Sequence, residues 1–193
     1  VTMELRLYDR ADAPEVRRLW NTAGAAAGYA PLDAEGLDAL LLAHPAFCAE
    51  STFVLEERGA LRGFAAGCTG DALAQGAVRG YVSCVLLDRA FDTAENTALL
   101  LGAIEDSFRA KGKSVAAVTF FNPLRLPWII PGTDGHQHNN MPGIPKDIPL
   151  YERMLSLGYR EAATEMAMYL DLAAFTYPAA MEERAAKMAA QGY

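Results

Sequence analysis

The chain has 193 residues, 52% of them apolar, with a formal net charge of −7 at pH 7 and a pI near 5.0. This length supports one domain with a sizeable core, and an acidic chain without a basic cluster excludes nucleic acid as an expected partner. No apolar run approaches the ~20 residues that cross a bilayer, and the N-terminus lacks the apolar core of a secretory signal, so we expect a cytoplasmic protein with no membrane partner.

The cysteines do not indicate a disulfide framework or a metal site, because their number is odd and their spacing is wide. Reduced, mostly buried thiols in a reducing compartment suit the pattern better. A nucleophilic thiol within the apolar run around Cys84 is disfavoured, since no activating partner lies nearby in the sequence. The three residues are Cys48, Cys68 and Cys84.

The N-terminal part of the chain predicts a strand followed by two helices. Residues 4–8 alternate polar and apolar side chains, as a half-buried strand does. Asp12 and Glu15 have the spacing of a capping pair at a helix start, and a second helix is expected over residues 33–43. The first helix has an apolar stripe formed by Val16, Leu19, Trp20 and Ala23.

The middle of the chain predicts a hairpin and then a strand, helix and strand that form one unit. Residues 52–57 and 61–66 are two β-rich runs joined by a short turn. Residues 81–87 and 114–121 have the apolar and β-branched content of buried strands. The helix between them is expected to end at Gly112. Such a unit crosses over right-handedly, so we expect its strands to pair in parallel within a mixed sheet. The expected buried face of the helix consists of Leu101, Ile104 and Phe108.

The C-terminal part begins with a long irregular stretch over residues 122–147. After the next helix, two strands are expected over residues 159–161 and 165–172. The tail that follows is rich in Ala, Met, Glu and Lys and predicts a helix over residues 179–190. This tail is typical of a linker or of the opening of a further domain, in which case the chain is a fragment of a longer protein. The alternative is a swapped or packing helix in a homodimer.

The segment LYERMLSLGY, residues 150–159, places a tyrosine within an amphipathic helix that stops at a glycine. Pro149 suits the first helical turn, and Gly158 can take the left-handed conformation that ends the helix. Tyr151 is therefore expected on a rigid element, where it has either a catalytic or a structural role. The expected buried stripe consists of Leu150, Met154, Leu155 and Leu157.

This segment resembles the last conserved segment of the GNAT N-acetyltransferase superfamily, in which the tyrosine protonates the departing coenzyme A thiolate. The order of the expected elements over residues 3–172 is similar to that of the GNAT fold as well. The resemblance implies an α/β (α+β) class, with a mixed central sheet of about seven strands flanked by about four helices. It implies a GNAT-like acetyltransferase domain over residues 3–172, followed by a tail over residues 173–193. It also implies Tyr151 as the catalytic acid.

The turn that binds the cofactor in this family departs from its pattern here. In GNAT enzymes this turn has the pattern Arg or Gln, any two residues, Gly, any one residue, and then Gly or Ala. The glycines allow the backbone to approach the coenzyme A pyrophosphate at a helix N-terminus. In LLDRAFDTAENTALLLGAIE, Phe91 falls on the aromatic position and Asp92 on the basic one. Glu95 and Thr97 fall on the small positions. Asp92 and Glu95 are expected to cap this helix, and both acids would repel an incoming pyrophosphate.

The resemblance implies acetyl-CoA as the cofactor, a small molecule or amine as the acceptor, and main-chain contacts in place of the missing glycines. An alternative is a catalytically inactive GNAT-like binding or structural domain, part of a longer acetyltransferase with a second GNAT domain. The expected cofactor-binding residues are Val85, Leu86 and Leu87 at the end of the strand, and Asp92, Thr93, Ala94, Glu95, Asn96 and Thr97 at the start of the helix.

The long loop before the Tyr151 helix is the expected substrate-binding element. Loops of this length inside a compact domain are often functional, and its apolar residues and prolines favour an ordered flap. The expected substrate-binding residues are Trp128, Asp134, His136 and His138. The alternative is a structural role, in which the polar side chains of this cluster hold the loop together. The two histidines could also bind a divalent metal, but two ligands fall short of the three or four that zinc demands, so no metal is expected.

Overall fold

The computed structural model describes residues 3–119, 122–138, 143–166, 168 and 170–192. Its strands are β1 (Glu4–Leu7), β2 (Thr52–Glu57), β3 (Ala60–Cys68), β4 (Arg79–Leu87), β5 (Val115–Ala117), β6 (Trp128–Ile129) and β7 (Gln137–His138). Its α-helices are α1 (Ala13–Leu19), α2 (Ala34–Leu37), α3 (Ala94–Ala110), α4 (Pro149–Ser156) and α5 (Ala179–Ala190). π-helical turns extend α1 over Trp20–Gly24 and α2 over Asp38–Leu42, and 3-10 turns cover Arg10–Asp12, Ala49–Ser51 and Arg89–Phe91.

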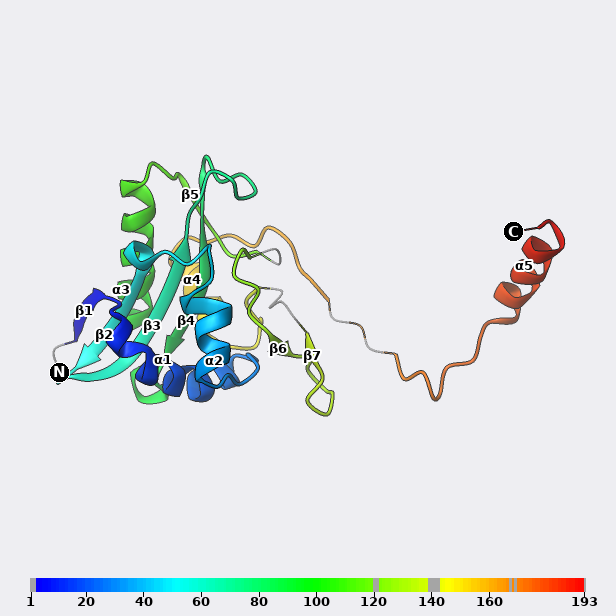
Figure 1. Cartoon of the computed structure of the whole chain (residues 1–193), viewed down its shortest axis with the longest axis horizontal. Helices are drawn as coiled ribbons and strands as arrows, with labels where there is room; N and C mark the ends of the chain where they lie inside the picture. The colour runs from blue at the N-terminus through cyan, green and yellow to red at the C-terminus, as the bar shows by residue number, and fades with distance from the viewer. Residues whose placement is uncertain (1–2, 120–121, 139–142, 167, 169, 193) are drawn as a thin grey trace.

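Strands β1 to β5 form one mixed sheet in chain order (Figure 1). All neighbours are antiparallel except β4 and β5, which are parallel as expected. The hairpin of β2 and β3 is also confirmed, and its turn places Arg58 and Gly59 at φ of 51° and 78°, where glycine costs least. The mixed α/β class is thus confirmed. The described residues of the central sheet form five strands rather than about seven, and β6 and β7 form a separate pair.

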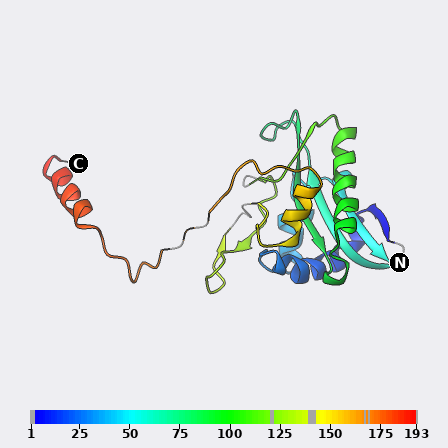
Figure 2. The same ribbon diagram turned by 180° about the vertical axis from the view of Figure 1, so that it is seen from behind.

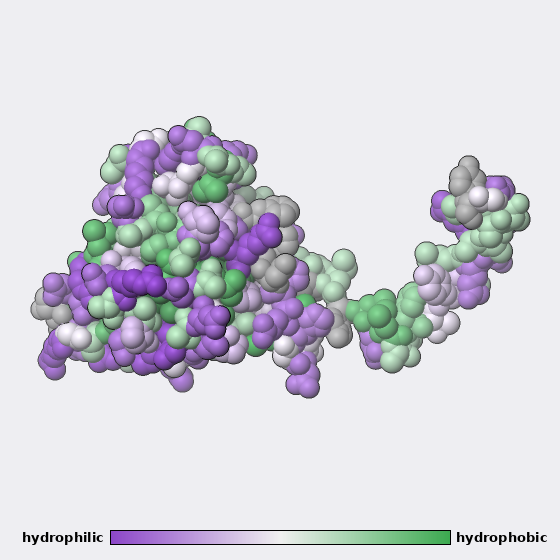
Figure 3. Space-filling model, in the orientation of Figure 1, coloured by the Kyte–Doolittle hydropathy of each residue, from purple (hydrophilic) through white to green (hydrophobic). Residues whose placement is uncertain are grey.

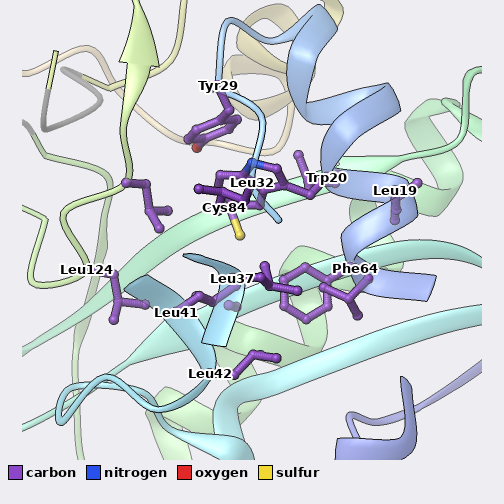
Figure 4. Close-up of a cluster of buried hydrophobic side chains, with 14 of the residues drawn as sticks. Leu19, Trp20, Tyr29, Leu32, Leu37, Leu41, Leu42, Phe64, Cys84 and Leu124 are labelled. Atoms are coloured by element: carbon purple, nitrogen blue, oxygen red, sulfur yellow. The ribbon is translucent and has the colours of Figure 1, made fainter. Parts of the chain in front are cut away.

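Helices cover both faces of the sheet (Figures 1 and 2). α1 and α2 lie on one face, and α3 and α4 lie side by side on the other. Between the sheet and α1 and α2, Trp20 is fully buried and donates its indole N–H to Ala30 O at 2.9 Å. Figure 4 shows this cluster, which includes Leu19, Trp20, Tyr29, Leu37, Leu41, Phe64, Cys84 and Leu124.

The second cluster lies under α3 and confirms the expected buried face of that helix. Leu101, Ile104 and Phe108 are at most 2% exposed. The helix ends as expected near Gly112, which has a φ of 71°, and Lys113 N–H closes the end by donating to Phe108 O at 2.9 Å.

Two expectations about side chains at helices are wrong. Asp12 does not cap α1 with Glu15, because Arg6 holds its carboxylate at 2.7 Å and the Asp9 N–H donates to it at 2.8 Å. On α4, Met154 is buried, but two members of the expected stripe, Leu155 and Leu157, are 37% and 44% exposed. A short helix of 8 residues buries a narrower face than the sequence pattern suggests.

The strands expected after α4 are not formed by the described residues of 159–161 and 165–172, and residues 167 and 169 lie outside the described part. Met166, Met168, Leu170 and Leu172 are 57% to 88% exposed. An alternating apolar pattern becomes a strand only beside a sheet edge that completes its hydrogen bonds. β5 is shorter than the expected 114–121, and residues 120 and 121 also lie outside the described part.

The C-terminal segment extends away from the main body and carries α5 at its end (Figure 1). The expected helix over 179–190 is confirmed. Apolar side chains gather on the extended segment before it (Figure 3). Among the described residues, none of the helices combines the length and the apolar character needed to span a bilayer.

Candidate cofactor site at the start of α3

The strands β4 and β5 pair only at their beginning. Their parallel register joins Arg79–Tyr81 to Val115–Ala117. β3 continues to pair with β4 as far as Leu87, but on the opposite edge of β4 no strand of the described residues follows β5. The Asp88 N–H donates to Arg62 O of β3, so by alternation the N–H groups of Val85 and Leu87 face the opposite, unpaired edge. The second half of β4 therefore offers main-chain hydrogen bonds at an open side of the sheet.

The connection between β4 and α3 is held in place by two arginines. Arg18 of α1 forms a two-point contact with the Asp88 carboxylate at 3.0 and 3.2 Å. Arg62 of β3 contacts the same carboxylate at 3.4 Å, and its guanidinium lies 4.8 Å from the centre of the Phe91 ring. These contacts fix the 3-10 turn that leads into α3.

Thr93, and not Asp92, caps α3. The Thr93 side chain accepts from the Asn96 N–H at 3.2 Å, and the Thr97 hydroxyl donates to Thr93 O at 2.9 Å. Asn96 is buried and donates through its side chain to Phe91 O at 2.7 Å. The expected capping pair of Asp92 and Glu95 is therefore wrong, because the threonine one position later supplies the cap.

Arg153 of α4 reaches the start of α3. One guanidinium nitrogen contacts the Asp92 carboxylate and lies 3.4 Å from the Thr97 hydroxyl, and the other donates to Asp92 O at 2.7 Å. The Arg153 side chain is 19% exposed and that of Asp92 is 34% exposed. Two helices far apart in the sequence are thus joined by one ion pair at the expected cofactor position.

Tyr151 also lies on α4, where its phenol donates to Glu161 at 2.6 Å. Lys146 pairs with the same carboxylate at 2.8 Å, and Thr164 donates to it at 2.6 Å. The hydrogen bond to Glu161 raises the pKa of Tyr151 above its usual value, while Lys146, Thr164 and Tyr151 lower the pKa of Glu161 to about 2. Tyr151 lines neither of the two cavities described below.

The expected substrate-binding residues of the long loop are not all brought together. Trp128 in β6 is 8% exposed and packs in the core beside α1 and α2. His138 in β7 lies opposite Trp128, with ring centres 6.1 Å apart, whereas Asp134 and His136 lie in exposed positions at the hairpin tip. No group of three or more metal-ligating side chains occurs among the described residues.

The described residues form at least two cavities. A cavity of about 10 Å³ lies between the loop and β4 and is lined by residues that include Tyr29, Ser83 and Asn122. A larger groove of about 700 Å³ lies between β1 and α3, away from α4, and is lined mainly by apolar side chains such as Leu7 and Leu99. Of these two, the small cavity is the one beneath the long loop.

The surroundings of the two buried thiols, Cys68 and Cys84, disfavour a nucleophilic role. Burial raises the pKa of Cys84 to about 12 and that of Cys68 to about 11. Cys48, Cys68 and Cys84 are all free, as expected for reduced thiols. A thiol whose pKa lies far above neutral pH is protonated and inert, which agrees with the expectation for Cys84.

The sequence pattern did not reveal three arginines of the candidate site, namely Arg153, Arg18 and Arg62. Each is a basic residue in an amphipathic helix or strand. Basic residues are also common on the solvent-exposed faces of such elements, so their presence does not indicate a binding site. Only the fold brings the three arginines to one connection. Val85, Leu86 and Leu87 lie where expected at the end of β4, and residues 92–97 lie at the start of α3.

No protein-family model and no curated protein matches the sequence. Solved structures do match. The ribosomal-protein-alanine N-acetyltransferase from Brucella melitensis biovar Abortus 2308 is 15% identical with a TM-score of 0.58, over 88% of this chain and 100% of that one. AAC(6')-Iy, in complex with the bisubstrate analog CoA-S-monomethyl-acetylneamine, is 13% identical with a TM-score of 0.52, over 89% of this chain and 99% of that one.

A second ribosomal-protein-alanine N-acetyltransferase, from Escherichia coli, is 15% identical with a TM-score of 0.52, over 84% of this chain and 80% of that one. The chain covers only 24% of the N-acetylglutamate synthase from Neisseria gonorrhoeae, at 22% identity and a TM-score of 0.47 over 60% of this chain. Likeness at these identities establishes architecture rather than activity. The chain has the fold of the GNAT N-acetyltransferases, as the Tyr151 segment and the order of its elements imply.

Proposed function

We propose that this chain is an acetyl-CoA-dependent N-acetyltransferase of the GNAT type that acts on a small-molecule amine. The observation that carries the proposal is the separation of β4 from β5 after Tyr81, next to the start of α3. This arrangement gives an extended ligand main-chain partners along β4 and an anion a helix N-terminus at its end.

The donors at the start of α3 fit a phosphate group. The N–H groups of Ala94 and Glu95 have no acceptor among the described residues, and both residues are exposed. Arg153 adds a guanidinium, which recognises phosphate oxygens with two donors at once. One feature opposes this fit, because the carboxylate of Asp92 already holds Arg153.

Acetyl-CoA supplies an activated acetyl thioester when bound. The chain's own groups would then have distinct tasks. Val85 and Leu87 N–H would align the ligand along β4, and Arg153 with the amides of Ala94 and Glu95 would bind its phosphates. Tyr151 would donate the proton that the leaving thiolate needs, because a phenol is protonated at neutral pH. The acceptor amine would enter beneath the long loop near Ser83.

Calorimetric titration with acetyl-CoA tests the proposal directly. Binding, followed by release of free thiol in the presence of a panel of small amines, is the expected result. Heat without thiol release would contradict catalysis but not cofactor binding.

A second candidate is a GNAT-like module that binds no cofactor and serves a structural or binding role. The ion pair between Asp92 and Arg153 favours it, because that pair already neutralises the guanidinium and joins α3 to α4. The same titration separates the two candidates. No heat with acetyl-CoA at high micromolar concentration would leave only the module.

A further inference from the structure

The ion pair of Asp92 and Arg153 occupies the place where a phosphate would contact α4 and α3 together. One terminal nitrogen of Arg153 contacts the Asp92 carboxylate, and the other donates to the Asp92 carbonyl oxygen. Asp92 itself lies directly before the capping residue Thr93. The carboxylate is thus an anion of the chain itself, held by a guanidinium and close in sequence to a helix start, and both of these attract anions.

A two-point contact between Arg153 and a second anion would need the terminal nitrogens that Asp92 already engages. The two terminal nitrogens of Arg153 already contact Asp92, and the remaining contact, to the Thr97 hydroxyl at 3.4 Å, is long. At 19% exposure, Arg153 has little solvent to screen a second anion from the first. A phosphate that binds Arg153 through both terminal nitrogens therefore competes with the carboxylate for them.

We propose that the Asp92–Arg153 pair is an internal latch, and that Asp92 competes with a cofactor phosphate for Arg153. In the closed state the pair joins α4 to the start of α3. In the open state Arg153 binds the phosphate, and the Asp92 carboxylate turns to solvent. This inference rests on the proposed function, because it names the residue that regulates the same cofactor site.

Removal of the competing carboxylate tests the latch. Asp92→Asn keeps the side-chain shape and removes the charge, so the open state becomes the populated one. We expect calorimetry to give an affinity for coenzyme A at least about tenfold above that of the unchanged chain, because apparent affinity scales with the competent fraction. Inorganic pyrophosphate, titrated in parallel, should show the same direction of change.

Glu152→Gln is the matched control. Glu152 precedes Arg153 on α4, is exposed, and forms no ion pair among the described residues. Its removal changes the net charge by the same amount, and it should alter the affinity for coenzyme A about twofold or less, as expected for a screened surface charge. An equal gain in affinity for coenzyme A in both variants would show that the effect comes from net charge alone, and it would overturn the latch.

Arg153 is tested in the background of Asp92→Asn. Adding Arg153→Gln should abolish the gain in affinity, and adding Arg153→Lys should keep part of it, because the lysine retains the charge but loses the two-point geometry. If Asp92→Asn does not fold, Asp92→Ser provides the same test. Circular dichroism of each variant verifies the fold.

The outcomes separate the latch from the proposed function. Binding of coenzyme A by the unchanged chain, with no effect of either Asp92 or Arg153, would leave the proposed function intact and overturn the latch. Binding by Asp92→Asn alone would support the latch and show that the unchanged chain is closed to its cofactor. Absence of binding in both proteins would overturn the latch and the proposed function together.

Discussion

At the scale of single residues, the chemistry of Tyr151 depends on its neighbour Glu161. The hydrogen bond to Glu161 raises the pKa of the phenol, so Tyr151 is a weaker proton donor while that bond is formed. The same bond directs the proton to a carboxylate at the protein surface. A catalytic Tyr151 must therefore exchange Glu161 for the leaving group, and the sequence alone could identify the phenol but not this partner, which lies 10 residues further along the chain.

Replacement of the phenol tests its role. Tyr151→Phe should lower turnover by about a hundredfold, the usual contribution of a positioned proton donor, and should leave the affinity for acetyl-CoA nearly unchanged. Steady-state kinetics measures both. Tyr159→Phe is the matched control, because Tyr159 also donates to a glutamate, Glu105 at 2.9 Å, but packs beside α3. An equal loss of turnover in both variants would remove Tyr151 from the mechanism.

The carboxylate of Glu161 provides a pH-dependent test of the same cluster. Its pKa is lowered from 4.5 to about 2, first by Lys146 and then by Thr164 and Tyr151. Because the folded chain binds this proton less tightly than the unfolded chain, the contacts stabilise the fold above pH 4.5 and are lost as the pH falls toward 2. NMR titration of the Glu161 carboxyl carbon should show this low pKa, and Lys146→Gln should raise it. A pKa of Glu161 near 4.5 in the unchanged chain would show that the cluster does not form in solution.

At the scale of elements, the packing of α3 on β4 depends on a glycine. A Cβ added at Gly80 would lie 2.4 Å from the Phe108 ring, so the helix must shift or the ring must leave its position. Gly80→Ala should lower the free energy of unfolding by about 1–3 kcal/mol, the usual cost of overpacking. Denaturant unfolding measures the change.

Gly102→Ala is the matched control within α3. A Cβ at Gly102 meets nothing within 4 Å, and alanine is favoured over glycine in a helix interior. This variant should raise the free energy of unfolding by up to about 1 kcal/mol. A loss of stability in Gly102→Ala similar to that in Gly80→Ala would mean that glycine flexibility, and not the contact with Phe108, matters on this face.

The elements also show which features the sequence could predict. Strong local signals identified the hairpin of β2 and β3 and the end of α3 at Gly112, because turn chemistry and apolar periodicity act over a few residues. The start of α3 was harder to predict, because Asp92, Thr93 and Glu95 are all residue types that occur at or near a helix N-cap. The choice of Thr93 is explained by Arg153, which engages Asp92 from 61 residues away, and no local pattern reports such a contact.

At the scale of the whole molecule, the order of the elements predicted the architecture, but the extent of the sheet was overestimated. The expected final strand alternates apolar residues correctly, yet Met166 and Leu172 are 79% and 77% exposed. The alternation of apolar and polar residues indicates that one face of a strand is suited to burial. It does not indicate which element would cover that face. The site shows the same limit, since its two helices are placed by the fold and its arginines come from three separate elements.

The exposed C-terminal segment leads to a final prediction. Every described residue from 173 to 192 is exposed, and α5 lies apart from the main body in both views (Figures 1 and 2). Removal of residues 173–193 should therefore change the free energy of unfolding by less than about 0.5 kcal/mol, as for surface changes that remove no packing. Denaturant unfolding of the shortened chain at two protein concentrations measures this. A larger loss that shrinks when the full chain is diluted would instead show that α5 packs against a second copy, because only the stability that comes from an intermolecular contact falls with protein concentration.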